Sequence, residues 1–156
     1  MAHAQAIKEA LNVEGYPSTL GWNYTYAGAG GVSFYPDQDS VIVRRLKAAG
    51  AVILGKTNIP AFSTSGDRTT SSWDGVTFNA VNPYLVPGAS SAGTATATAA
   101  GFAAWGVAEE TGTSIQNPSS AQSLVGVRTT YGLVDRDGLA PLAGRCAAFL
   151  LLGAWW

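Results

Sequence analysis

The order of the clearest segments predicts a fold of the α/β class. Apolar residues recur at helical spacing across residues 41–49. Asp39 or Ser40 provides an N-cap for this helix, and Gly50 is a natural stop. The apolar run at residues 51–54 (AVIL) follows directly, which is typical of a strand buried on both faces. A helix that leads into such a strand indicates alternating helices and strands around a sheet.

Other segments carry weaker signals. Residues 1–15 show mild helical or mixed character, and the polar residues 63–82 predict a surface excursion. In residues 91–104 the alternation of Thr with Ala favours a strand, whereas the alanine content favours a helix. We expect a helix of small residues packed close to its neighbours. Residues 103–107 and 124–128 predict two further strands.

The composition limits the class of partner. A chain of 156 residues is long enough for one domain with a hydrophobic core. Charged residues make up 12% of the chain, about half of the usual share, so much of its surface is expected to be covered. The net charge is −1 and no basic block is present, which argues against a nucleic acid partner.

Cysteine usage and the two termini indicate a cytoplasmic protein. Cys146 is the only cysteine, so no internal disulfide can form, and this fits a reducing compartment. The first residues lack the long apolar region of a secretory signal. Residues 146–156 are apolar but too short to span a bilayer, so no membrane span is predicted.

The scarcity of histidine narrows the chemistry. His3 is the only histidine and lies next to the chain start, where residues are usually mobile. This argues against a Ser-His-Asp site and against a histidine-based metal site, and we expect neither metal nor cofactor. The general base of a hydrolase would then be Asp, Glu or one of the three lysines, Lys8, Lys47 and Lys56.

Two loops rich in Gly and Ser lie between residues 88 and 118, and they contain Ser90 and Ser114. Small flanking residues allow close backbone approach and can present N–H groups to an oxyanion. Lys56 follows the strand at residues 51–54, at the sheet edge where α/β proteins bind ligands. We expect these three side chains to meet as one acyl-transfer site. By residue type alone, a helix-capping Ser90, a turn serine at Ser114 and a solvent-facing Lys56 stay open.

A phosphate-binding loop is disfavoured. Residues 50–57 match the pattern GxxxxGK[ST] letter for letter. The four residues between the glycines favour a strand rather than a loop that wraps an anion. Asn58-Ile59-Pro60 follows where the motif needs a helix to begin.

Three long segments resemble the amidase signature family. They are YPDQDSVIVRRLKAAGAVILGKTN, VPGASSAGTATATAAGFAAWGVAEETGTSIQNPSS and LVGVRTTYGLVDRDGLAPL, which together span about residues 35–144. The earlier segment IKEALNVEGYPST is similar to the one that precedes them in that family. The resemblance implies a mixed sheet with flanking helices, forming the central part of an amidase-signature fold.

The resemblance also implies a Ser-cisSer-Lys catalytic triad. Ser114 matches the nucleophile, Ser90 matches the cis-serine that relays the proton, and Lys56 matches the lysine that receives it. Such a lysine has to be neutral near pH 7, which requires its pKa to fall by roughly three units from the reference value. Burial beside apolar strands is expected to supply that shift.

The family's oxyanion hole is formed by backbone N–H groups just before the nucleophile. Those positions are matched here by Thr111, Gly112 and Thr113. The implied activity is hydrolysis of a small-molecule amide or ester through an acyl-enzyme. Carboxylesterase activity with the same triad and a non-catalytic remnant that only oligomerises are the alternatives.

The chain is shorter than members of the family. We therefore expect residues 1–156 to form a single, incomplete amidase-signature domain that self-associates as a homo-oligomer. Residues 145–156 do not match the family pattern. This tail is interpreted as a terminal strand that plugs a core, as a dimer contact, or as an artefact.

Overall fold

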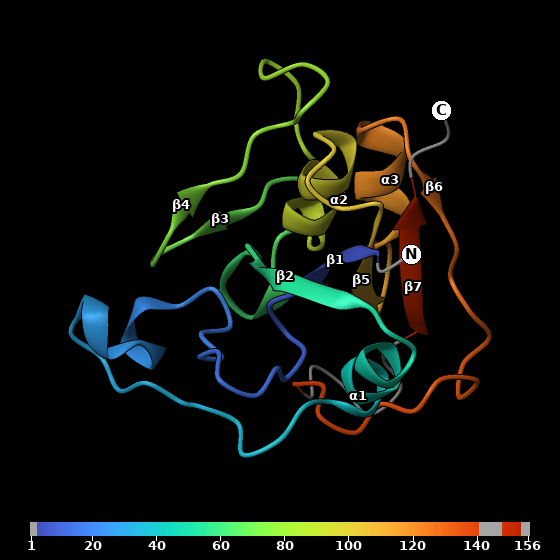
Figure 1. The fold of residues 1–156 in the computed structure, drawn as a ribbon. Helices are drawn as coiled ribbons and strands as arrows, with labels where there is room; N and C mark the ends of the chain where they lie inside the picture. Colours follow the sequence, from blue (N-terminus) through green and yellow to red (C-terminus); the bar gives the residue numbers. More distant parts are fainter. Residues whose placement is uncertain (1–2, 141–147, 154–156) are drawn as a thin grey trace.

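A mixed sheet forms the centre of the computed structural model, which describes residues 3–140 and the backbone of residues 148–153. Its five strands are β1 (Ala4–Lys8), β2 (Val52–Thr57), β5 (Trp105–Glu110), β6 (Val125–Gly126) and β7 (Ala148–Gly153). Their order across the sheet is β2-β1-β5-β7-β6 (Figure 1). β1 runs parallel to β2 and β5, whereas β7 runs antiparallel to β5 and β6. The predicted α/β class with a mixed sheet is confirmed.

Helices cover the two faces of this sheet. They are α1 (Val41–Ala48), α2 (Ala92–Ala99) and α3 (Gln116–Ala121). Val43 of α1 belongs to one buried cluster with Val107 of β5, and Ala95 of α2 belongs to another with Ala108. Because successive residues of a strand point to opposite faces, α1 lies on one face and α2 on the other.

Small residues allow α2 to lie close against the sheet. A Cβ atom on Gly106 would come within 2.3 Å of Thr94 Cγ2, and one on Gly93 within 2.4 Å of the carbonyl oxygen of Asn58. The hydroxyls of Thr57 and Thr94 are 2.7 Å apart, which joins α2 to β2 by a hydrogen bond. The predicted helix of small residues in this region is confirmed.

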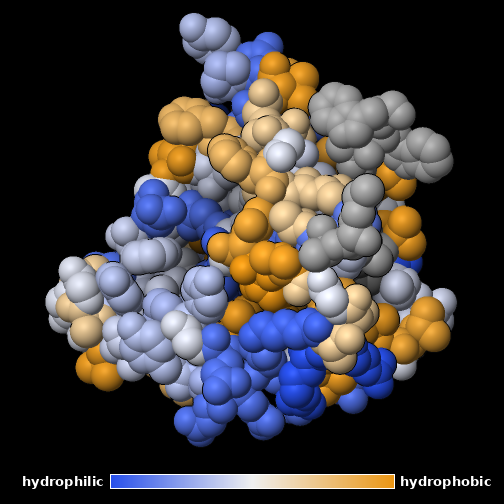
Figure 2. Space-filling model, viewed as in Figure 1, coloured by the Kyte–Doolittle hydropathy of each residue, from blue (hydrophilic) through white to orange (hydrophobic). Residues whose placement is uncertain are grey.

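Two predictions about strands are wrong. Residues 4–8 form the buried strand β1 rather than a helical segment, with every residue after Ala4 buried. β2 is an edge strand, so Val52 and Leu54 remain 50% and 51% exposed instead of buried. Only Ile53, on the opposite side of β2, packs against the cluster beneath α1. Figure 2 shows the resulting apolar surface at the centre of this face, over β2.

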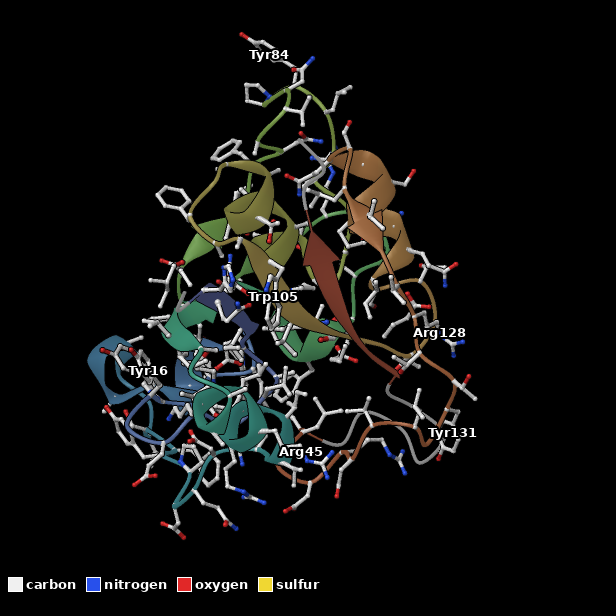
Figure 3. All side chains as sticks on the ribbon, turned by 45° about the vertical axis from the view of Figure 1, so that its right-hand side comes forward. Tyr16, Arg45, Tyr84, Trp105, Arg128 and Tyr131 are labelled. Carbon is white, nitrogen blue, oxygen red and sulfur yellow. The ribbon has the colours of Figure 1, made fainter. Side chains whose placement is uncertain are left out.

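Shorter elements extend from the sheet. They are the 3-10 helices η1 (Asn23–Thr25), η2 (Ala27–Ala29) and η3 (Ala61–Ser63) and the hairpin strands β3 (Thr70–Ser71) and β4 (Gly75–Val76). Tyr84 is 95% exposed and points away from the body at the tip of the following loop (Figure 3). No helix within residues 3–140 is long and apolar enough to cross a bilayer.

The tail contributes a strand to the sheet. β7 pairs with β5 from Trp105↔Gly153 to Glu110↔Ala148, and it also pairs with β6. Of the three interpretations of the tail, a terminal strand therefore describes residues 148–153. Cys146 and the last three residues lie outside the part of the chain that the structure describes.

Candidate active site

The carboxyl ends of three parallel strands meet at one edge of the sheet. β1 ends at Lys8, β2 ends just after Lys56, and β5 ends at Glu110. In open α/β sheets this edge is where ligands bind, because the loops that follow the strands gather there. The predicted Gly-Ser loops both lie at this edge, one before α2 and one directly after β5.

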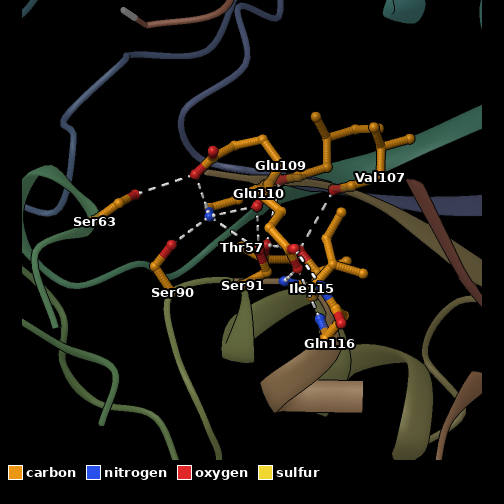
Figure 4. A network of polar contacts seen from close by, with 12 residues as sticks. Thr57, Ser63, Ser90, Ser91, Val107, Glu109, Glu110, Ile115 and Gln116 are labelled. Carbon is orange, nitrogen blue, oxygen red and sulfur yellow. Dashed lines mark hydrogen bonds and ion pairs between the residues drawn. The ribbon is translucent and has the colours of Figure 1, made fainter. Parts of the chain in front are cut away.

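Lys8 lies at the centre of a buried polar network. Figure 4 labels its partners Ser90, Ser91 and Glu109. Its Nζ donates to Ser90 Oγ at 2.6 Å and to Ser91 Oγ at 2.9 Å. It also donates to the backbone carbonyl of Glu109 at 3.3 Å and forms an ion pair with the Glu109 carboxylate. Lys8, Ser90 and Ser91 are fully buried, and Glu109 is 1% exposed. A lysine and a serine hydroxyl are therefore in direct contact, away from water.

Lys56 does not make the predicted contact with Ser90. Its Nζ instead donates to Glu9 Oε1 at 3.1 Å, to Ser18 Oγ at 3.0 Å and to the Pro17 carbonyl at 3.2 Å. The strand order explains the difference, because β1 lies between β2 and β5. The lysine that can reach the serine loops therefore belongs to β1, and Lys8 takes the place expected for Lys56.

Sequence reasoning missed Lys8 because β1 was not recognised as a strand. Gln5 and Lys8 interrupt its apolar pattern, although both are fully buried in the sheet. A usable signal was present, since the short apolar run before Lys8 repeats the arrangement of residues 51–56, where an apolar strand leads into a lysine. Two such segments predict two lysines at one sheet edge.

The first serine loop is fixed against the second. Gly88 has a φ of +82°, and a Cβ there would come within 2.5 Å of Asn117 Oδ1. The same oxygen accepts a hydrogen bond from the Ala89 N–H at 3.1 Å. The peptide bond between Ala89 and Ser90 is cis. Beyond it, the Ser91 N–H donates to the Ser114 carbonyl at 3.3 Å, so the two serine loops lie side by side.

The capping interpretation of the first loop is not supported. Ser91 occupies the N-cap position of α2, but its side chain makes no capping hydrogen bond. Its hydroxyl donates instead to the Glu109 carbonyl at 3.1 Å, and Ser90 bonds to Lys8. Both serine side chains face the lysine rather than the start of the helix.

The Glu110 side chain shapes the second loop. This fully buried carboxylate accepts hydrogen bonds from the N–H groups of Ile115 at 2.8 Å and Gln116 at 3.0 Å. Arg128 Nε lies 3.1 Å from its other oxygen. Ser114 is partly exposed, and its Oγ has no hydrogen bond to any described residue. The loop therefore presents a serine hydroxyl to solvent on a fixed backbone.

Three exposed backbone positions precede Ser114. Thr111, Gly112 and Thr113 follow the end of β5 and are exposed. Their N–H groups donate no hydrogen bond within the described residues. A Cβ on Gly112 would meet nothing within 4 Å, so there is open space beside this turn. Unpaired N–H groups beside a serine hydroxyl are the donors that an oxyanion requires.

Burial controls the electrostatics of both lysines. Desolvation lowers the pKa of Lys8, and this effect is opposed by the charge and hydrogen bond of Glu109 and by the charge of Glu110. Desolvation also lowers the pKa of Lys56, against the opposing charge of Glu9. Of the two, only Lys8 contacts a serine of the glycine-rich loops. Within the described residues, no three His, Cys, Asp or Glu side chains cluster as metal ligands.

A comparison with protein families finds a match that covers most of the chain. A family model described as Amidase matches residues 5–149. This chain belongs to the amidase family. The match is longer than the resemblance over residues 35–144 noted from the sequence. It also includes β1 with Lys8 and the first residues of β7.

Individual members of the amidase family are similar over most of this chain. A glutamyl-tRNA(Gln) amidotransferase subunit of Cyanothece sp. is 41% identical over 138 residues, which is 88% of this chain and 27% of the relative. Its counterpart in Salinispora arenicola is 39% identical over 94% of this chain and 30% of its own length. The chain therefore spans less than a third of these curated relatives.

Solved structures of amidases share the fold. Native peptide amidase from Stenotrophomonas maltophilia aligns with a TM-score of 0.86 and 30% identity, over 97% of this chain and 30% of its own. The glutamyl-tRNA(Gln) amidotransferase subunit from Thermotoga maritima has the same TM-score and identity, over 97% of this chain and 32% of its own.

Proposed function

We propose that this chain carries the acyl-transfer site of an amidase and cleaves a C–N amide bond through an acyl-enzyme. The observation that carries the proposal is the buried contact of 2.6 Å between Lys8 Nζ and Ser90 Oγ. The backbone hydrogen bond from Ser91 to Ser114 holds a second, accessible serine beside it. Lys8, Ser90 and Ser114 then form the triad that the family resemblance assigned with Lys56.

In the first step, Ser114 Oγ attacks the acyl carbon of the amide. The Ser114 proton passes to Ser90, whose own proton passes to neutral Lys8. The C–N bond then breaks, and Lys8 returns a proton through Ser90 to the departing amine. The acyl group remains on Ser114 until water or an amine attacks it, which gives hydrolysis or amide transfer.

The N–H groups of Thr111, Gly112 and Thr113 are the proposed oxyanion hole. Negative charge develops on the carbonyl oxygen when Ser114 attacks, and backbone donors aimed at it lower the barrier. Removal of one such donor costs roughly 3–4 kcal/mol of barrier in comparable sites. The exposed, unpaired amides of this turn support the assignment.

The site and the relatives support the proposed substrate class. Solved relatives include a peptide amidase, and the curated relatives are amidotransferase subunits. A small-molecule amide is therefore the proposed substrate, and an ester is an easier substrate for the same nucleophile because its leaving group is better. Cytoplasmic location and homo-oligomerisation remain predictions, as does a single domain over residues 1–156.

The test is turnover of an aryl amide and of a short aryl ester by the chain, compared with Ser114→Ala. Loss of at least a hundredfold in kcat/KM is expected for both substrates, because the nucleophile is absent. Arg45→Met, at an exposed residue of α1, is the control and should keep full activity. Turnover of the ester alone would favour the carboxylesterase alternative. No turnover and no labelling by a serine-directed fluorophosphonate would favour the non-catalytic remnant.

A further inference from the structure

A buried carboxylate that none of these steps uses lies against Lys8. Glu109 is 1% exposed, and its Oε1 forms the ion pair with Lys8 Nζ. The same oxygen accepts a hydrogen bond from Ser63 Oγ of η3 at 3.4 Å. Figure 4 shows Ser63, Ser90 and Ser91 around this group. The pair joins the ends of β1 and β5 at the centre of the site.

The other charged groups near Lys8 have partners of their own. Glu110 bonds to Arg128 and to the amides of the second serine loop. Glu9 bonds to Lys56 on the β2 side and to the N–H groups of Thr19 and Leu20. Within the described residues, Glu109 is the carboxylate in direct contact with Lys8. Its charge therefore acts on the lysine most strongly.

We propose that Glu109 is a positioning residue of this site, whose carboxylate holds the Lys8 ammonium against Ser90 and Ser91. An ammonium group has three N–H donors, and the oxygens of these three residues surround it. Lys8 must give up one of these protons, and with it the ion pair, before it can receive a proton from Ser90. The catalytic consequence of Glu109 rests on the proposed function, but its ion pair with Lys8 can be tested without turnover.

Glu109→Gln tests the proposal because it removes the charge and keeps the shape. A carboxylate beside an amine favours the charged amine, so its removal lowers the pKa of Lys8, in the same direction as burial. The neutral lysine then forms at lower pH. Glu14→Gln, at an exposed glutamate, is the matched control and should change nothing.

The first readout is an NMR titration of the chain labelled at lysine Cε. With three lysines, the spectrum is assigned through Lys47→Arg and Lys56→Arg. Glu109→Gln should lower the titration midpoint of Lys8 by roughly one to three pH units. An unchanged or raised midpoint overturns the proposal, whether or not the chain turns over an amide.

The second readout is the pH dependence of kcat/KM. Its acidic limb should move to lower pH in Glu109→Gln by the same amount as the Lys8 midpoint. A merely structural role would lower activity without moving this limb, and that result also counts against the proposal. If the wild-type chain is inactive while the Lys8 midpoint shifts, the proposed function fails but the role of Glu109 stands.

Folding of the variants is checked first by near-UV circular dichroism. If Glu109→Gln does not fold, Glu109→Asp should lower the Lys8 midpoint, because its shorter carboxylate is drawn away from Nζ. If neither variant folds, the proposal is tested by an NMR titration of the wild-type chain labelled at glutamate Cδ. Its Glu109 carboxyl signal should move at the pH where Lys8 titrates, and a signal that does not respond there overturns the proposal.

Discussion

Two buried lysines at one edge of the sheet differ in their partners. Lys8 meets two serines and Glu109, whereas Lys56 meets Glu9, Ser18 and a backbone carbonyl. Glu9 also accepts the N–H groups of the segment after Pro17. Lys56 therefore joins β2, the end of β1 and the loop that follows it.

Lys56→Met should destabilise the chain, because Glu9 is left as a buried carboxylate without its cation. The side chains of Lys56 and Glu9 are 7% and 5% exposed, so the loss should reach roughly 3 kcal/mol. Urea unfolding followed by circular dichroism measures the change. The double variant Lys56→Met/Glu9→Gln should recover part of the loss. Equal stability of wild type and Lys56→Met would show that the pair contributes nothing.

At the scale of elements, the sequence predicts α1 and α2 well and β1 poorly. Helical periodicity with a Gly stop, and a run of Ala and Thr, are local signals. β1 carries buried Gln5 and Lys8, whose polarity is explained only by partners distant in the sequence. Ser90 and Ser114 could be proposed from the sequence because glycine-rich loops are also local signals. Which lysine reaches them depends on the strand order, which no local pattern contains.

Close packing of α2 on the sheet makes Gly106 sensitive to substitution. Gly106→Ala should destabilise the chain by about 1–3 kcal/mol, because the new methyl would lie 2.3 Å from Thr94 Cγ2. Thr94→Ser removes that methyl and should rescue part of the loss. Gly66→Ala is the control, since a Cβ there meets nothing within 4 Å. Thermal unfolding compares the variants. A Gly106→Ala variant as stable as the wild type would contradict the close packing of α2 on the sheet.

At the scale of the whole molecule, apolar surface remains uncovered. Val52 and Leu54 are half exposed on β2, an edge strand of the sheet. Figure 2 shows apolar surface at the centre of this face. The matches to its curated relatives cover most of this chain but less than a third of each relative, so the relatives contain much sequence that this chain lacks. An exposed strand edge with apolar side chains favours association.

Charges placed on β2 should therefore reduce self-association. Val52→Lys/Leu54→Lys is expected to weaken association at least tenfold, because the apolar contact is lost and like charges are brought together. Sedimentation velocity over a range of concentrations measures this, with Val32→Lys as a control at an exposed residue outside the sheet. A monomeric wild-type chain at all concentrations would contradict the prediction of a homo-oligomer.

Serine labelling tests most directly whether Lys8 or Lys56 activates Ser114. A serine-directed fluorophosphonate is added to the wild type, Lys8→Met and Lys56→Met, and adducts are located by peptide mass spectrometry under conditions where all three are folded. An adduct on Ser114 is expected in the wild type and in Lys56→Met, with labelling at least a hundredfold slower in Lys8→Met. Rapid labelling of Ser114 in Lys8→Met, with loss of labelling in Lys56→Met, would contradict this expectation.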